Sequence, residues 1–404
     1  MTLPDTDIFK SIVSRVFRVE EVTLGDPTPR TGARLPSSPG YFLRYRGELT
    51  CDSLEAYDQL AAAVLPYDIT PLFRIEDGRQ TILLMRGTMH PKPGRVWVNM
   101  LLFVLTLFSV LFAGAMYSYS GPVPTDSLGQ TWTLLTHLWV GWPFALSLLS
   151  ILLAHEFGHY FAGRRRGAAV SLPYFIPFPL SLLGTMGAFI QLKQLPKNKR
   201  ALFDLAIAGP LAGLAVAIPV LLYGLSRSTL STITGVPGSF VEGNSLLYLL
   251  AKFVVFGKLL PAVPDLSGLP LLFHWISYFF TGLPLPVGSL DVMIDPVAWA
   301  AWAGLLVTFL NLIPAGQLDG GHVIYAVFGK RVNRILPVIL AATVLLGFFW
   351  SGWWLWAVLI FLLGRSHAEP LDQITQLDPS RKALAVLMLV IFLLVLMPVP
   401  LMTF

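Results

Sequence analysis

Two histidines four residues apart, His155 and His159, enclose a glutamate, Glu156, at the end of a long uncharged stretch. Because residues four apart share one face of a helix, both imidazoles can bind the same metal ion, and the carboxylate beside them can take a proton. The preceding stretch, 139–154, contains no charged residue, so a helix there would place the motif at membrane depth. Ionisable groups are costly inside a membrane and usually have a function there. The motif therefore predicts a zinc peptidase that cuts within a membrane.

A catalytic zinc ion usually has three protein ligands and one position open to water, so a third ligand must lie elsewhere. Six residues after His159, where some soluble zinc proteases have a further histidine, the chain has Arg165. No acidic residue lies between Glu156 and Asp204. The remaining candidates are Asp204 and Asp319, and Asp319 follows a proline and a glycine that interrupt a hydrophobic segment. Such a break is tolerated in a membrane where it lines a cavity or is buried in protein.

Composition indicates a membrane protein rather than a soluble enzyme. The 404 residues are 55% hydrophobic and only 13% charged, whereas soluble domains carry about 25% charged residues. The single cysteine, Cys51, excludes an intrachain disulfide and a thiolate-rich metal site. The first residues lack the basic and then apolar order of a cleaved signal peptide, so we expect insertion to rely on internal segments.

Seven hydrophobic segments approach the length of about 20 residues that crosses a bilayer. They are 96–117, 137–161, 202–225, 296–314, 335–350, 353–364 and 383–402. We expect the fifth and sixth to form a tight helical hairpin, because one helix of about 30 residues would exceed the hydrocarbon thickness. The predicted fold is a polytopic α-helical membrane protein with about six or seven transmembrane helices. Between the third and fourth segments, residues 226–295 are predicted to form interfacial or re-entrant helices on the extracytoplasmic side.

Lysine and arginine are unevenly distributed among the loops. Of the sixteen beyond residue 95, thirteen fall in segments that we place on one side, and Arg227, Lys252 and Lys258 fall on the other. Cytoplasmic loops carry the excess of positive charge. We therefore expect the N-terminal region and the active-site mouth at the cytoplasmic face of a bacterial inner membrane. This topology explains the pI of about 9.3, so no nucleic-acid partner is expected.

The first 92 residues are predicted to form a small soluble α/β domain, and residues 93–404 the membrane domain. We expect a strand at 41–49, a helix at 53–65 capped by Asp52, and a hairpin of strands 70–76 and 80–85. Twelve basic and twelve acidic residues precede Val96, so the domain has no strong field. It is interpreted as a solvated accessory domain, and the alternative is a sensor or substrate filter near the catalytic mouth.

Residues 172–193 are too interrupted by proline and glycine for a spanning helix and too apolar for a solvated loop. We expect a re-entrant β-hairpin shielded by protein. Its strand could pair with an unwound substrate segment, which would expose a carbonyl that a helix hides. The candidate substrate-binding residues are Gly184, Thr185, Met186, Gly187, Ala188 and Phe189.

These motifs together resemble the site-2 protease family of intramembrane zinc proteases. The resemblance rests on His-Glu-Phe-Gly-His at 155–159, followed by Asn-x-x-Pro at 311–314 and Leu-Asp-Gly-Gly at 318–321. The Gly-Pro motif within 203–213 is similar to the family's third-span motif, and 184–189 to its re-entrant hairpin. The N-terminal domain and the lack of an obvious inserted PDZ domain resemble the cyanobacterial and chloroplast branch related to the EGY proteins.

The resemblance implies that His155, His159 and Asp319 bind one Zn²⁺ ion and that Glu156 is the general base. It also implies single-span membrane proteins as substrates and the lipid bilayer as surroundings; the oligomeric state is not predicted. Asn311 is a candidate donor to the oxyanion, or a polar residue that satisfies local backbone.

Two other polar residues have open interpretations. Asp204 could orient a ligand histidine or simply begin a helix, and His322 could support the ligands or face water. Gly209 and Gly213 are predicted to let helices pack closely. The competing function is a membrane metal transporter or a non-hydrolytic zinc-binding scaffold, but a transporter needs acceptors along a path, and this chain offers one cluster near one face.

Overall fold

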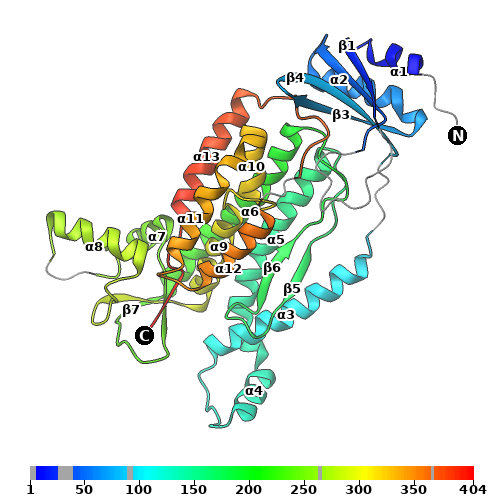
Figure 1. The fold of residues 1–404 in the computed structure, drawn as a ribbon. Helices are drawn as coiled ribbons and strands as arrows, with labels where there is room; N and C mark the ends of the chain where they lie inside the picture. Colours follow the sequence, from blue (N-terminus) through cyan, green and yellow to red (C-terminus); the bar gives the residue numbers. More distant parts are fainter. Residues whose placement is uncertain (1–5, 26–39, 89–93, 263–265, 365–367) are drawn as a thin grey trace.

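The computed structural model of the chain describes residues 6–25, 40–88, 94–262, 266–364 and 368–404. Figure 1 shows an elongated molecule with a small α/β domain at one end and a bundle of helices in the middle. Short strands and peripheral helices lie at the other end.

The N-terminal domain is a four-stranded antiparallel sheet with two helices. Its elements are α1 (Thr6–Val13), β1 (Phe17–Leu24), β2 (Leu43–Leu49), α2 (Ser53–Val64), β3 (Ile69–Glu76) and β4 (Arg79–Arg86), and the sheet order is β1-β2-β4-β3. The predicted helix and three strands are confirmed, and the Asp52 side chain accepts a hydrogen bond from the Leu54 N–H. The β3–β4 turn places Asp77 and Gly78 at φ 51° and 78°, as the Asp-Gly sequence predicts. α1 and β1 were not predicted.

Among the described residues, three helices are long and apolar enough to cross a membrane. They are α3 (Val96–Ser118), α5 (Trp142–Arg165), which extends a short 3₁₀ turn from Leu138, and α6 (Lys199–Arg227). They confirm the first three predicted hydrophobic segments as helices. α5 and α6 pack tightly: a Cβ on Gly158 of α5 would lie 2.5 Å from the Ala208 carbonyl oxygen of α6.

Shorter helices complete the bundle. They are α9 (Pro296–Asn311), α10 (Asp319–Phe328), α11 (Leu336–Leu346), α12 (Gly352–Leu363) and α13 (Pro379–Val395). α9 is almost entirely buried and forms the centre of the core. The two helices of the predicted hairpin, α11 and α12, are confirmed. α13 ends seven residues before the predicted limit of 402, because the chain then turns through Pro398 and Pro400 into a short strand.

The end opposite the N-terminal domain is built from small elements. These are α4 (Ser127–Thr136), β7 (Thr229–Thr232), β8 (Phe240–Glu242), α7 (Leu246–Phe256), α8 (Gly268–Thr281), β9 (Leu290–Met293) and β10 (Leu401–Thr403). β7 pairs with β9, and β8 pairs with β10. Helices were expected within 226–295, and α7 and α8 are found there, whereas the strands and α4 were not predicted. α8 projects from the bundle (Figure 1) and exposes Leu269 and Phe273, as an interfacial helix would.

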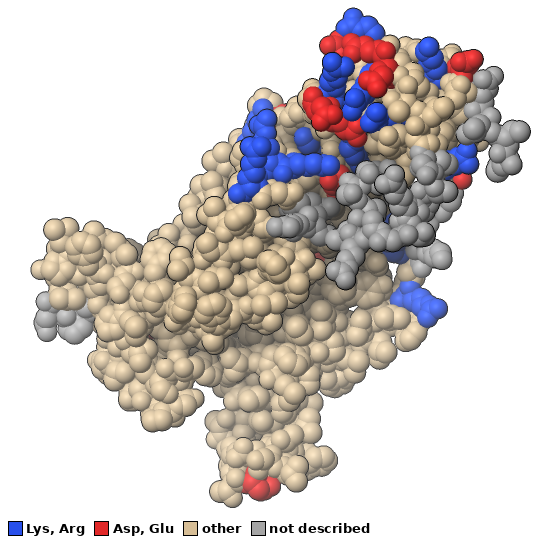
Figure 2. All heavy atoms as spheres, viewed as in Figure 1, with Lys and Arg blue, Asp and Glu red and all other residues tan. Residues whose placement is uncertain are grey.

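Charged side chains are concentrated at the end of the molecule that carries the N-terminal domain. Figure 2 shows Lys, Arg, Asp and Glu gathered on the N-terminal domain and the adjoining end of the bundle, while most of the remaining face lacks charge. A broad uncharged surface such as this face is what contact with lipid requires.

The chain between α12 and α13 joins the N-terminal domain to the bundle; we call residues 368–378 the linking segment. Its Leu371 carbonyl accepts from the Phe73 N–H at 2.9 Å, and its Gln373 N–H donates to the Phe73 carbonyl at 3.0 Å. It therefore forms an isolated parallel β-bridge, Phe73 with Asp372, at the edge strand β3. On its other side, Leu371 and Asp372 donate to the carbonyls of Pro196 and Lys197, just before α6.

Arg74 makes the buried side-chain hydrogen bonds from β3 to the linking segment. It is buried, and its Nη1 lies 3.0 Å from the Pro370 carbonyl oxygen and 2.8 Å from that of Leu371. We expect Arg74→Ala to weaken the docking by about 2 kcal/mol, since hydrogen bonds from a charged donor contribute about 1.5–3 kcal/mol. The Phe73 and Gln373 amides should then exchange hydrogen faster. Arg79→Ala, an exposed arginine on the same hairpin, is the control, and equal exchange in both variants would contradict this role.

Candidate metal centre

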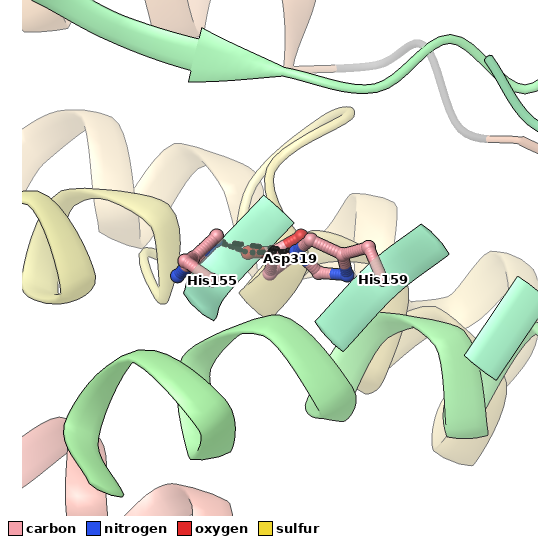
Figure 3. Close-up of side chains that lie close together, drawn as sticks. All are labelled: His155, His159 and Asp319. Atoms are coloured by element: carbon pink, nitrogen blue, oxygen red, sulfur yellow. Dashed lines mark hydrogen bonds and ion pairs between the residues drawn. The ribbon is translucent and has the colours of Figure 1, made fainter. Parts of the chain in front are cut away.

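Three side chains from two helices converge where the C-terminal half of α5 meets the start of α10. His155 Nε2 lies 3.2 Å from Asp319 Oδ2, His159 Nε2 lies 3.3 Å from the same oxygen, and the two Nε2 atoms are 3.2 Å apart (Figure 3). A tetrahedral zinc site with metal–ligand distances of about 2.0–2.1 Å has ligand–ligand edges of about 3.3–3.4 Å. The triangle of ligand atoms therefore has the size that such an ion needs.

The tautomer of His159 also suits a metal ligand. Its Nδ1 lies 2.7 Å from the carbonyl oxygen of Leu205 in α6, and a carbonyl can only accept. Nδ1 therefore carries the proton, and the lone pair of Nε2 points at the other two ligand atoms. A backbone carbonyl leaves no sequence signal, so this partner was not predicted.

Glycines allow the histidines and the aspartate to come together. A Cβ on Gly209 of α6 would lie 2.1 Å from His159 Nε2, and one on Gly213 would lie 3.3 Å from His155 Nδ1. At the start of α10, a Cβ on Gly320 would lie 2.0 Å from the Leu312 carbonyl oxygen. The bare backbone at Gly320 thus permits the tight return of the chain that brings Asp319 to α5.

Glu156 and Asn311 border the ligand triangle. Glu156 is buried and lines the same cavity as Ile190. The Nδ2 atom of Asn311 lies 3.3 Å from His155 Nε2. Both residues line a cavity of about 200 Å³ together with the three ligand candidates. A proton acceptor and an amide donor therefore face the space beside the metal position.

The predicted hairpin is confirmed as β5 (Tyr174–Pro177) paired with β6 (Thr185–Phe189). Of the six candidate substrate-binding residues, Ala188 and Phe189 line the metal cavity. Gly184 instead anchors the hairpin: its carbonyl accepts from Ser109 Oγ at 2.5 Å, and its φ of 72° favours glycine. The Thr185 hydroxyl donates to the Ile176 carbonyl within the hairpin. Met186 is exposed, and Gly187 has a φ of 96° with open space beside it.

The other two candidates differ in position. Asp204 accepts two hydrogen bonds from Arg381 of α13, at 2.7 and 2.8 Å, and also pairs with Arg166. It links helices rather than touching a ligand histidine. His322 is buried one turn after Asp319 and lines the metal cavity. It also lines a larger cavity of about 710 Å³ that shares Gln317 and Phe189 with the first and reaches Pro196 and Ala368, near the linking segment.

Comparison with known proteins gives one family and several relatives. The model of peptidase family M50 matches residues 143–351, which include every residue of the ligand triangle. The probable zinc metalloprotease EGY1, chloroplastic, of Oryza sativa subsp. japonica is 29% identical over 346 residues, 79% of this chain and 53% of the relative. EGY1 of Arabidopsis thaliana is 28% identical, and the match covers 78% of this chain and 56% of the relative. EGY2 of Oryza sativa subsp. indica is also 28% identical, and the match covers 88% of this chain and 61% of the relative. The chain thus spans little more than half the length of these curated relatives.

The metal content of purified variants can show which carboxylate, Asp319 or Asp204, is the third metal ligand. We expect Asp319→Ala to lose most bound metal, because one vertex of the triangle disappears, whereas Asp204→Ala should keep it, because Asp204 pairs with arginines. Metal analysis of both purified variants decides this. Metal loss in Asp204→Ala alone would make Asp204 the ligand.

Gly209 should be equally important for metal binding. In Gly209→Ala the new methyl would overlap the His159 ring, so the imidazole must leave its place or the helices must separate. We expect metal affinity to fall at least tenfold, with a smaller effect for Gly213→Ala, whose methyl meets His155 at 3.3 Å. Metal titration of both variants measures the order; equal affinities would show that the ring has room to move.

Proposed function

The chain belongs to peptidase family M50, and we propose that it is a zinc endopeptidase that hydrolyses peptide bonds within or near the transmembrane segments of other proteins. The observation that carries this proposal is the triangle of His155, His159 and Asp319, with Glu156 beside it, at the end of a membrane-length helix. The curated relatives are named as probable zinc metalloproteases, in keeping with zinc as the metal.

The residues around the triangle divide the reaction between them. The two imidazoles and the Asp319 carboxylate would hold zinc, which would supply the Lewis acid that activates water and polarises a peptide carbonyl. The Glu156 carboxylate accepts the proton of the attacking water and returns it to the leaving amine. The Asn311 amide donates a hydrogen bond to the carbonyl oxygen as negative charge develops there. The Leu205 carbonyl keeps the His159 ring oriented through the cycle.

We further place the protein across a membrane in several passes. We propose that the three long helices supply three spans and that the shorter α9, α11, α12 and α13 supply the others, about six or seven in all. The Lys and Arg residues gathered on the end of the bundle that adjoins the N-terminal domain (Figure 2) support a cytoplasmic mouth and N-terminal domain, as in a bacterial inner membrane. In this arrangement the enzyme would cut single-span proteins during regulated intramembrane proteolysis.

Substrate presentation follows from the hairpin. β6 ends beside the metal cavity, where Ala188 and Phe189 face the same space as Glu156. An unwound substrate segment that pairs along β6 would bring its scissile carbonyl to that space in extended form. This requirement favours substrates that unwind easily near the cleavage site.

Glu156→Gln tests the chemistry. The amide keeps the shape of the side chain but cannot take a proton, so we expect hydrolysis to fall by a factor of about 10²–10⁴ while zinc is retained. The measurement is cleavage of a panel of single-span membrane proteins by the purified protein, with and without chelator. Substantial turnover by the variant, or chelator-insensitive cleavage by the wild type, would reject this mechanism.

A further inference from the structure

A second buried cluster of ionisable side chains lies at the end opposite the N-terminal domain. Glu242 of β8, Asp291 of β9 and Lys252 of α7 are 6%, 3% and 0% exposed. Lys252 Nζ lies 3.3 Å from Asp291 Oδ1 and 4.7 Å from the centre of the Tyr248 ring. The Tyr248 hydroxyl donates to Glu242 at 2.8 Å. None of these groups takes part in the hydrolysis described above.

When both carboxylates and the ammonium are ionised, the cluster carries a net charge of −1. An uncompensated buried charge is strongly unfavourable, so the cluster must take up a proton or a cation. Burial and the neighbouring Asp291 raise the pKa of Glu242 to about 7. The other titratable groups that face it are Tyr248 and Lys252, with Tyr278 of α8 close to both carboxylates. Above neutral pH the cluster is therefore suited to a positively charged ligand.

The two carboxylates border a cavity of about 340 Å³ that also has aromatic walls. Tyr117 at the end of α3 and Trp299 at the start of α9 line it. Trp299 is 3% exposed, and its indole Nε1 makes no full hydrogen bond to a described residue; the nearby Tyr117 hydroxyl donates instead to the Leu182 carbonyl. Carboxylates beside aromatic faces favour lysine and arginine side chains. The unsatisfied indole N–H is suited to a carbonyl oxygen of the same ligand, which points to a peptide.

The cavity is connected to the metal centre by two elements. The Tyr117 hydroxyl donates at 2.7 Å to the carbonyl of Leu182, in the turn of the β5–β6 hairpin. The far end of β6 lines the metal cavity. α9 likewise begins at the cavity with Trp299 and ends with Asn311 beside His155. At 1.5 Å per residue, α9 sets a separation of roughly 20 Å between the two sites.

From this arrangement, and resting on the proposed function, we propose that the cavity beside Glu242 and Asp291 binds a lysine or arginine side chain of the substrate and so selects the substrate and its cleavage position by charge. The separation between the two sites also sets the distance along the substrate between its basic residue and the scissile bond. A substrate that lies extended along β6 would need a basic residue about six or seven positions from the scissile bond, whereas a helical one would need about fourteen.

The test uses the purified, zinc-loaded chain and single-span substrates that differ at one position only. Lysine, glutamine or glutamate is placed from five to sixteen residues from the cleavage site, on the flank that lies at the cavity end. We expect kcat/KM to be at least tenfold higher for lysine than for glutamine at one spacing, and lowest for glutamate. The lysine preference should shrink as the pH falls below 7, because Glu242 becomes neutral.

Enzyme variants locate the effect. Glu242→Gln keeps an acceptor for the Tyr248 hydroxyl but loses the charge, so the lysine-to-glutamine ratio should fall toward one. Asp126→Asn is the control: it removes a carboxylate from the same end but preserves the cap of α4, and the ratio should persist. Zinc content and thermal unfolding show whether each variant is folded. If Glu242→Gln does not fold, the three wild-type substrate series decide alone.

The outcomes separate the two proposals. Equal cleavage of the lysine, glutamine and glutamate substrates at every spacing would overturn the cavity assignment and leave the peptidase intact. Potassium or calcium chloride that raised cleavage of the glutamine substrate to the lysine level would assign the cavity to a free inorganic cation instead. No chelator-sensitive cleavage of any substrate would overturn the peptidase and, with it, this inference.

Discussion

The contact between the His159 ring and the backbone of α6 governs the arrangement of the catalytic end. One ring nitrogen donates to the Leu205 carbonyl, and the ring edge lies where a side chain of residue 209 would otherwise be. Polar ligands can be buried in an apolar bundle only when their remaining hydrogen-bonding groups are satisfied. Close approach of α5 and α6 meets that condition, and it needs small residues on both helices: Gly158 on one and Gly209 on the other. Asp319 then completes the site from a separate helix, because glycine lets the chain fold back tightly.

Local sequence patterns predicted most of the helices and the two histidines of the candidate metal centre. The four-residue spacing of His155 and His159 encodes a shared helix face whatever surrounds it. Hydrophobic length located α3, α5 and α6, and the Asp-Gly turn located the β3–β4 hairpin. Each of these patterns involves only residues that are close in sequence, so it can be recognised without knowledge of the fold.

Features that depend on distant partners were not predictable in this way. β8 is three residues long and is defined by pairing with β10, more than 150 residues later. The role of Asp204 is set by Arg381, which is 177 residues away, and the orientation of His159 by a backbone carbonyl. The linking segment contains no motif, since backbone groups make its pairing with β3. In each case the information resides in the tertiary structure rather than in the local composition.

The linking segment also has a consequence for biosynthesis. The Arg74 side chain cannot form its hydrogen bond to the Leu371 carbonyl until the ribosome has added a further 297 residues. At a synthesis rate of about 5–20 residues per second, the edge of β3 remains uncovered for roughly 15–60 s after the N-terminal sheet has emerged. During that interval the sheet carries an open strand edge, which is a template for wrong pairing. A chain that stops short of residue 371 lacks the groups that pair with Phe73, so truncated products would keep a strand edge exposed that the finished protein covers.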